Sequence, residues 1–256
     1  MRNITKKQDE LEWHPIEELQ KVDRDYSGWG SDLDILKVKG ENGKIFFCHT
    51  KRKSKKHPEK FSTRFGCFVS ADYGEFGGTL KLPEGGNLSG NFCDVFDFGE
   101  SVYAVESLGH MMGSFGLLEF TGASEYKEIY HTKGIFDGSW DFTESLNMNA
   151  CVKMEDAVWF LRGGETIEHR EGEERGEIKS CARLLKLTED GLEEAVSCEE
   201  RFSYVEDMVI VDEAAYISLD KMVVKLDIET GECRYWTTLS KEECENFADK
   251  YGLGRA

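Results

Sequence analysis

The residues most able to do chemistry are a histidine and a serine in one glycine-rich segment. His110 and Ser114 belong to segment 109–116, which reads GHMMGSFG. A serine hydroxyl activated by a neighbouring imidazole is a common nucleophile in acyl transfer. The segment does not match the G-x-S-x-G turn of serine hydrolases, and no pattern places an acid beside the pair. We therefore expect a structural role for this segment and predict no catalytic residue.

Paired carboxylates are a second source of chemistry. Two pairs have short spacing, Asp94 with Asp97 and Asp137 with Asp141. A glycosidase uses one carboxyl group as an acid and a second as a base or nucleophile. The chain contains 50 acidic residues, so close pairs arise by chance, and charged side chains are mostly solvated. A carbohydrate-active hydrolase or lyase is therefore kept as an alternative to a binding protein.

The histidines and cysteines do not follow a ligand pattern. The six histidines show neither H-x-H nor H-x-x-x-H spacing, and the eight cysteines include no C-x-x-C pair. Spacing of that kind is typical of metal sites in sequences. We predict no metal and no cofactor.

The beginning of the sequence and its hydropathy favour the cytoplasm. Residues 1–12, MRNITKKQDELE, contain no apolar stretch of the kind that a secretory signal needs. No run approaches the ~18 apolar residues of a membrane-spanning helix. We expect a cytoplasmic protein that makes no contact with a membrane, with reduced and mostly buried cysteines.

The charge balance indicates what kind of partner the chain would bind. There are 50 acidic and 32 basic residues, for a formal net charge of −18. Nucleic acid is disfavoured as a partner, because phosphate binding needs clustered lysine and arginine. A basic protein is favoured by charge complementarity. The basic run 51–60 and the acidic insertion 165–177 are expected to be loops between strands, since blocks of like charge often are.

Four short stretches with one shared pattern reveal the elements that must position these residues. Each is an apolar–charged–apolar triplet followed by a glycine turn, and the triplets are 80–82, 118–120, 185–187 and 224–226. Alternation of this kind predicts a half-buried strand, and the glycine predicts the hairpin after it. Recurrence along the chain is typical of repeat architectures. Neighbouring apolar runs predict three or four strands in each unit.

The two ends of the chain read differently from the middle. Residues 1–25 are predicted to be a polar lead-in with a short helix that has Pro15 in its first turn. Residues 26–240 are predicted to form the β domain. Ser240 and Glu243 fit a capping box, so residues 241–256 are predicted to hold a C-terminal helix.

Meanders of this length resemble the blades of β-propellers. The best match is segment 226–232, LDIETGE, which is similar to the hairpin that ends many propeller repeats. The Gly-His and Trp-Asp marks of WD40 blades are missing, and the period is irregular. The resemblance implies an all-β, propeller-like meander of about four to five blades with a short C-terminal helix. An irregular β-sandwich or barrel is the alternative.

A second resemblance concerns function. Segment 91–100, NFCDVFDFGE, and the strand after it are similar in style to the immunity proteins of bacterial polymorphic toxins, including those of contact-dependent inhibition. This resemblance implies an antitoxin that occludes the active site of a basic toxin domain. A generic interaction scaffold is a further alternative. The binding residues expected are acidic side chains with aromatic anchors, namely Trp29, Asp32, Asp94, Asp97, Trp140, Glu168, Glu171, Glu173 and Glu174.

Overall fold

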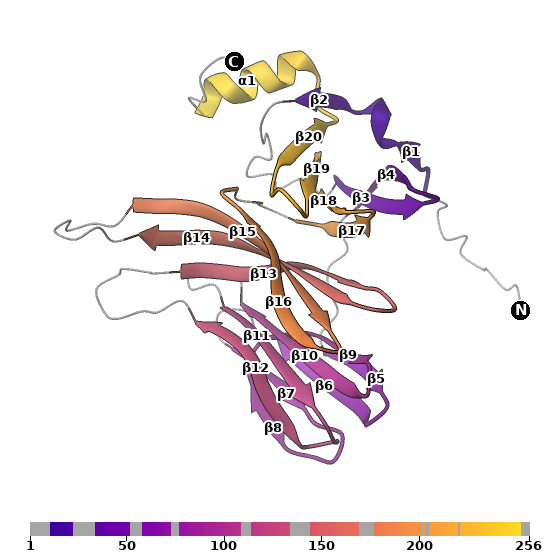
Figure 1. The fold of residues 1–256 in the computed structure, drawn as a ribbon, viewed down its shortest axis with the longest axis vertical. Helices are drawn as coiled ribbons and strands as arrows, with labels where there is room; N and C mark the ends of the chain where they lie inside the picture. Colours follow the sequence, from indigo (N-terminus) through magenta and orange to yellow (C-terminus); the bar gives the residue numbers. More distant parts are fainter. Residues whose placement is uncertain are drawn as a thin grey trace, which may run out of the picture. The chain divides into compact units, whose positions relative to one another are not determined.

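The chain forms two compact units of antiparallel β-sheet (Figure 1). The computed structural model describes residues 11–22, 34–51, 58–72, 77–108, 114–133, 144–168, 177–200, 202, 205–219 and 221–251. Unit 1 combines residues 1–53 with residues 203–256, and unit 2 comprises residues 54–202. The prediction of an all-β protein with one short helix near the C-terminus is confirmed for the part of the chain that is described.

Unit 2 contains three four-stranded sheets, each with its strands in chain order. We number the sheets along the chain. Sheet 2 consists of β5 (Glu59–Thr63), β6 (Gly66–Asp72), β7 (Gly78–Lys81) and β8 (Asn87–Ser89). Sheet 3 consists of β9 (Phe92–Phe98), β10 (Ser101–Leu108), β11 (Ser114–Phe120) and β12 (Tyr126–Lys133). Sheet 4 consists of β13 (Glu144–Lys153), β14 (Val158–Glu168), β15 (Glu177–Thr188) and β16 (Gly191–Cys198).

Sheet 3 packs on both of its faces. One face meets sheet 2 through a cluster that includes Phe68 and Phe120, whose rings lie 5.1 Å apart. The other face meets sheet 4 through a second cluster, in which the ring of Phe160 lies 5.7 Å from that of Phe115. Full burial of such side chains stabilises the fold by about 2 kcal/mol each. Consecutive sheets therefore stack face to face in the order of the chain.

The four triplets all mark the third strand of a four-stranded meander. They fall on β7, which ends one residue before Leu82, on β11, on β15 and, in unit 1, on β19 (Met222–Asp227). The apolar members of the triplets are buried, and Leu80, Phe120 and Leu226 are fully so. The sequence signal was the alternation of a strand whose charged residue lies on the opposite face from its two apolar neighbours. The wide gap between the second and third triplets contains the connection 134–143 and the long first strands of sheet 4.

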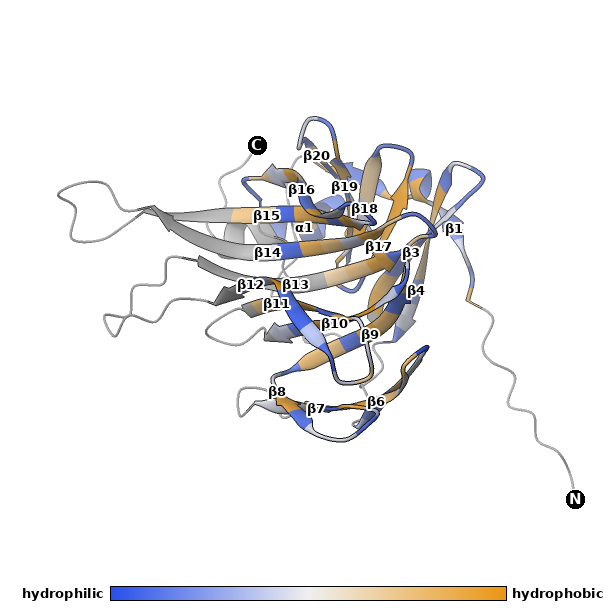
Figure 2. Ribbon diagram, turned by 60° about the horizontal axis from the view of Figure 1, so that its bottom comes forward, coloured by the Kyte–Doolittle hydropathy of each residue, from blue (hydrophilic) through white to orange (hydrophobic). Residues whose placement is uncertain are grey.

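Unit 1 combines segments of residues 1–53 with segments of residues 203–256 in two sheets. Sheet 1 has the order β1 (His14–Pro15), β4 (Lys44–Lys51) and β3 (Asp34–Glu41). Sheet 5 is the meander β17 (Asp207–Val211), β18 (Ala214–Ser218), β19 and β20 (Cys233–Thr237), with β2 (Gln20–Val22) added at its outer edge. A cluster that includes Leu36, Phe47 and Val223 joins the two sheets. Figure 2 shows hydrophobic residues along these strands and polar ones at many of the turns between them.

The segment before β2 corrects one prediction. The short helix expected near Pro15 is a single 3-10 turn, Ile16–Glu18, between β1 and β2. Ile16 and Leu19 are buried, so the apolar pattern was right although the extent of the helix was not. Pairing of β1 with β4 and of β2 with β20 holds the flanking residues extended, which leaves room for only one turn.

The predicted hairpin at 226–232 and the predicted C-terminal helix are both present. In the hairpin, Asp227 Oδ1 accepts hydrogen bonds from the Thr230 amide at 2.9 Å and the Thr230 hydroxyl at 3.0 Å, and Gly231 has a φ of 74°. Helix α1 spans Lys241–Tyr251. The Ser240 amide donates to Glu243 Oε2 at 2.7 Å and the Glu243 amide donates to Ser240 Oγ at 3.3 Å, which is the reciprocal pattern of a capping box.

Candidate binding surface

The strands of unit 2 give this unit two different ends. The connections β5–β6, β9–β10 and β15–β16 are tight turns, and the β7–β8, β11–β12 and β13–β14 connections are also short. We call this side the turn end. The opposite side, which we call the loop end, is where β12 and β14 stop and where β13 and β15 start. The connections 134–143 and 169–176 therefore leave and re-enter unit 2 at the loop end.

Contacts between sheets show that sheets 2 and 3 point the same way. At the turn end, Arg64 of the β5–β6 turn contacts Asp97 near the end of β9, and Ser124 of the β11–β12 turn donates to Glu84 of the β7–β8 turn at 3.3 Å. Towards the loop end, Ser70 of β6 donates to the carbonyl of Phe92 at the start of β9. In sheet 4, Glu144 at the start of β13 is opposite Thr166 near the end of β14. Both connections therefore meet sheet 4 at its loop end.

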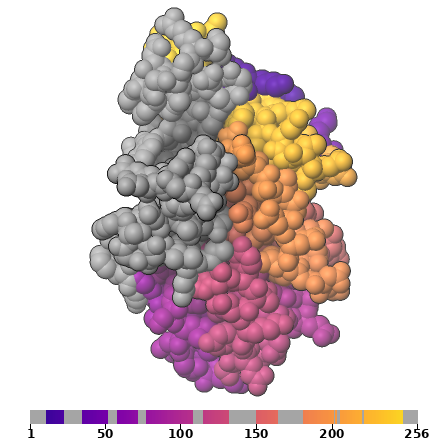
Figure 3. Space-filling view, turned by 60° about the vertical axis from the view of Figure 1, so that its left-hand side comes forward, coloured from indigo at the N-terminus to yellow at the C-terminus, as the bar shows by residue number. Residues whose placement is uncertain are grey.

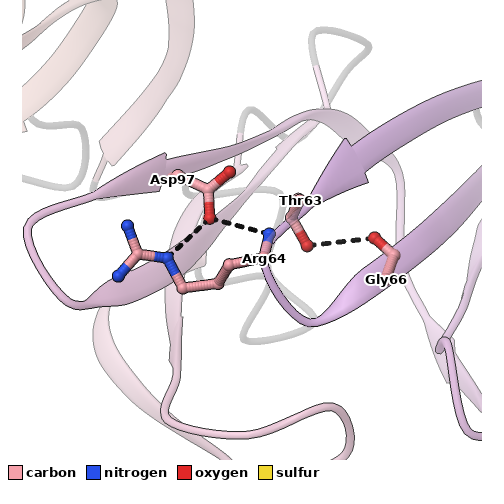
Figure 4. A network of polar contacts seen from close by, with 4 residues as sticks. All are labelled: Thr63, Arg64, Gly66 and Asp97. Atoms are coloured by element: carbon pink, nitrogen blue, oxygen red, sulfur yellow. Dashed lines mark hydrogen bonds and ion pairs between the residues drawn. The ribbon is translucent and has the colours of Figure 1, made fainter.

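Asp97 forms hydrogen bonds within unit 2. Its Oδ1 accepts hydrogen bonds from the Arg64 amide at 3.0 Å and from Arg64 Nε at 2.9 Å (Figure 4). Thr63 closes the same turn by donating to the Gly66 carbonyl at 3.1 Å. Asp97 therefore fastens the β5–β6 turn of sheet 2 to sheet 3, and its charge is compensated by the arginine.

Asp94 is also compensated. Its Oδ2 lies 2.7 Å from Lys153 Nζ, which in turn lies 4.5 Å from the centre of the Phe96 ring. Asp94 shares the face of β9 that meets sheet 4, whereas Asp97 lies on the face that meets sheet 2, since side chains alternate along a strand. The two carboxylates point to opposite faces, so they do not form the acid and base of one glycosidase site.

The other expected binding residues are placed only in part. Glu168 is the last residue of β14, at the loop end, and only its backbone is described. Glu165 also lies in β14 and Glu177 begins β15, so the expectation that the whole insertion 165–177 is a loop is wrong at both of its ends. The remaining residues lie outside the described part of the chain, and they are Trp29, Asp32, Trp140, Glu171, Glu173 and Glu174. The same holds for His110 and for the pair Asp137 and Asp141.

A buried arginine midway along β14 was not anticipated from the sequence. Arg162 is fully buried between sheets 3 and 4 and donates from Nη1 to the Tyr130 hydroxyl. Its guanidinium lies 5.4 Å from the centre of the Phe115 ring and 5.2 Å from that of Tyr130. Arg183 is its direct neighbour across β14 and β15 and lies 3.7 Å from Glu194. The available signal was a charged residue that ends the apolar run 157–161.

A second polar group occupies the opposite face of sheet 3. Glu106, Gly116 and His131 are aligned across β10, β11 and β12. A Cβ atom built on Gly116 would lie 3.3 Å from Glu106 Oε2 and 3.6 Å from His131 Cδ2, so the glycine makes room for both side chains. His131 Nδ1 lies 3.1 Å from Glu128 Oε2. Nothing in the spacing of these residues distinguished them in the sequence.

A third polar network lies towards the turn end. Glu119 accepts from the Ser101 hydroxyl at 2.8 Å and lies 2.8 Å from Lys127 Nζ. Burial acts to raise the pKa of Glu119, but the hydrogen bonds from Lys127 and Ser101 outweigh it and hold that pKa below its usual range. Burial, reinforced by the charge of Glu119, raises the pKa of Tyr103. A carboxylate with a lowered pKa is a poor proton acceptor, so we assign this network a structural role. It joins β10, β11 and β12 of sheet 3 through Ser101, Glu119 and Lys127.

These features define the class of protein. Within the described ranges it is an all-β protein of stacked antiparallel meanders, in which polar clusters lie at several places on sheets 3 and 4. No three His, Cys, Asp or Glu side chains of the described residues are grouped as a metal site. None of the described residues form a helix that is long and apolar enough to cross a bilayer.

The chain matches no protein-family model, no curated protein and no solved structure.

Proposed function

We propose that this protein is a binding inhibitor of the immunity type, which occludes the active site of a basic toxin domain in the bacterial cytoplasm. The observation that carries the proposal is the polarity of unit 2. Connection 134–143, which contains Trp140, enters sheet 4 at its loop end. Connection 169–176, which contains Glu171, Glu173 and Glu174, leaves and re-enters sheet 4 at the same end. Aromatic side chains are enriched in the hot spots of protein interfaces, and acidic side chains favour a basic partner by charge complementarity.

A β-propeller is the arrangement that we propose for the whole chain. Sheets 2, 3 and 4 stack in chain order, as successive blades do, and sheets 1 and 5 pack together in unit 1 although they come from distant parts of the sequence. Addition of β2 to β20 ties the start of the chain to the last meander. The five sheets would then be five blades. A crystal structure in which they do not surround a common axis would refute this arrangement.

Electrostatics supplies the mechanism of the proposed inhibition. The net charge is −18, and the carboxylates of Asp94 and Asp97 are each compensated by a basic side chain of unit 2. We therefore assign the binding charge to the insertion 165–177, which contains six glutamates and two arginines, instead of to β9. Acidic loops would take the place of the phosphate groups of the toxin's substrate. Complementary potentials raise the rate of association and make it depend on salt.

The test starts with affinity capture of a partner from the native host and continues with kinetics on the purified pair. The triple variant Glu171→Gln, Glu173→Gln and Glu174→Gln removes three charges from the loop end. Its matched control removes three exposed charges from the turn end, by Glu100→Gln, Glu125→Gln and Glu155→Gln. We expect association to slow by about tenfold in the first variant and to change little in the control. A rate that is independent of salt, or equal losses in the two variants, would contradict the proposal.

A further inference from the structure

Among the sheets of unit 2, the outer edge of sheet 4 is a free edge strand with an unusual charge. β16 pairs through one side with residues 182–188 of β15, and no strand of the described residues pairs with its other side. An edge strand of this kind offers unpaired amide and carbonyl groups to another extended segment. Gly191, Glu193, Glu194 and Ser197 are exposed along it. Figure 3 shows atoms of the orange part of the chain, to which β16 belongs, on the face that it presents.

The same kind of edge already accepts a strand elsewhere in this protein. β20 is the fourth strand of the sheet 5 meander, as β16 is of sheet 4. The three residues of β2 pair with it in antiparallel register, with Gln20 opposite Thr237 and Val22 opposite Tyr235. The fold therefore tolerates an added strand at the outer edge of a meander.

The charge of β16 selects the kind of strand that would fit. Residues 188–200 read TEDGLEEAVSCEE and contain six acidic residues and no basic one. The nearest compensating groups belong to β15, where Arg183 lies 3.7 Å from Glu194 and Lys186 is opposite Glu193. The outer edge of sheet 3 differs, because β12 carries Lys127 and Lys133, and that of sheet 2 is only the three-residue strand β8.

The alternation of side chains refines this selection. Glu193 and Glu194 are consecutive, so they lie on opposite faces of sheet 4, and a second consecutive pair, Glu199 and Glu200, follows six residues later. A residue of an added strand shares a face with the residue opposite it. Two consecutive basic residues would thus meet one acidic pair on both faces.

We propose that β16 is a docking edge for an extended, basic segment of a protein partner, which adds to sheet 4 as a further antiparallel strand and carries pairs of consecutive lysine or arginine residues. Main-chain hydrogen bonds would supply the affinity, and the acidic pairs would set the register. The inference concerns a different part of unit 2 from the loop end. It depends on the proposed function only in taking a basic protein as the partner.

The experiment uses the full chain and the synthetic peptide Lys-Lys-Val-Thr-Val-Thr-Lys-Lys, blocked at both ends. A control peptide has the same charges but carries N-methyl groups on its four central amides, so its central residues cannot donate strand hydrogen bonds. Calorimetry measures both affinities, and amide hydrogen exchange by NMR locates the contact. We expect binding of the first peptide only, with increased protection at alternate amides between residues 191 and 198. Equal binding of the two peptides would overturn the proposal.

Two variants separate strand pairing from general charge. Glu193→Gln with Glu194→Gln is expected to weaken binding of the first peptide by about fivefold. The control, Glu155→Gln with Asp156→Asn, removes the same charge from an exposed turn of the same sheet and is expected to leave the affinity unchanged. Equal losses would overturn the proposal. Self-association of the Glu193→Gln, Glu194→Gln variant with unaltered peptide binding would also overturn the proposal, because the acidic pair would then serve only to prevent edge-to-edge pairing of two copies. If the triple loop-end variant binds a captured partner as fast as the unchanged protein does, the proposed function is refuted, but the proposal for β16 is not.

Discussion

The buried pair of Arg162 and Tyr130 gives a prediction that can be worked through quantitatively. Replacing Tyr130 with phenylalanine removes the hydroxyl that accepts from Arg162 and leaves the ring beside the guanidinium. Hydrogen bonds to charged donors contribute about 1.5 to 3 kcal/mol. We expect Tyr130→Phe to lower the free energy of unfolding by about 2 kcal/mol.

The arginine is tested in the same cycle. Arg162→Met keeps an unbranched apolar side chain in the same space but removes the charge and its hydrogen bonds, and we expect a loss of about 3 kcal/mol. The double variant should lose about 3 kcal/mol instead of the sum, because the shared hydrogen bond can be lost only once. The coupling energy is therefore expected to be near 2 kcal/mol.

Equilibrium urea unfolding of the four proteins, followed by circular dichroism, measures the cycle. Tyr126→Phe is the matched control, because Tyr126 is 47% exposed and its loss of a hydroxyl should change the free energy of unfolding by less than about 0.5 kcal/mol. A coupling energy below about 0.5 kcal/mol would refute the view that this hydrogen bond fastens sheet 4 to sheet 3.

Three further predictions test other parts of the fold. Gly66 has a φ of 119°, and a Cβ there would lie 2.9 Å from the Cβ of Pro83, so Gly66→Ala should lower the free energy of unfolding by about 2 kcal/mol. Gly43 has a φ of 71° and open space around it, so Gly43→Ala should cost about half as much in the same unfolding assay. Burial raises the pKa of the Cys151 thiol to about 12, so iodoacetamide at neutral pH should label the exposed Cys67 well before Cys151, and equal labelling seen by mass spectrometry would contradict this. Hydrogen bonds from the amide and hydroxyl of Thr230 hold the pKa of Asp227 below its usual range, so the turn stabilises the fold above the ordinary pKa of aspartate, and this contribution is lost as the pH falls through the lowered pKa. Asp227→Ala should therefore lower the free energy of unfolding at neutral pH and make that free energy fall less steeply in acid. Parallel plots of unfolding free energy against pH for the variant and the unchanged protein would argue against the assignment.

Local patterns predicted much of this fold. The triplets identified four third strands because alternation reports which face of a strand is buried, and Leu80, Leu187 and Leu226 are indeed in the core. The turn 226–232 and the capping box at Ser240 were visible because their hydrogen bonds join residues that are close in sequence.

Features that depend on contacts between distant segments were not predictable. The pairing of β2 with β20 joins residues about two hundred positions apart, and no local pattern marks such a partner. The partners of Asp94 and Asp97, which are Lys153 and Arg64, come from other sheets. The sequence could therefore show that these residues were acidic, but not that their charges were already compensated.

The division of the chain has a consequence for how the protein is made. Residues 54–202 are continuous, so unit 2 can begin to fold while the ribosome is still adding later residues. Unit 1 lacks half of its material until β17 to β20 have emerged, and β2 must wait for β20. During synthesis the earliest segment would hence remain exposed to chaperones and proteases longer than the segment that follows it, and its docking would be a late event in biogenesis.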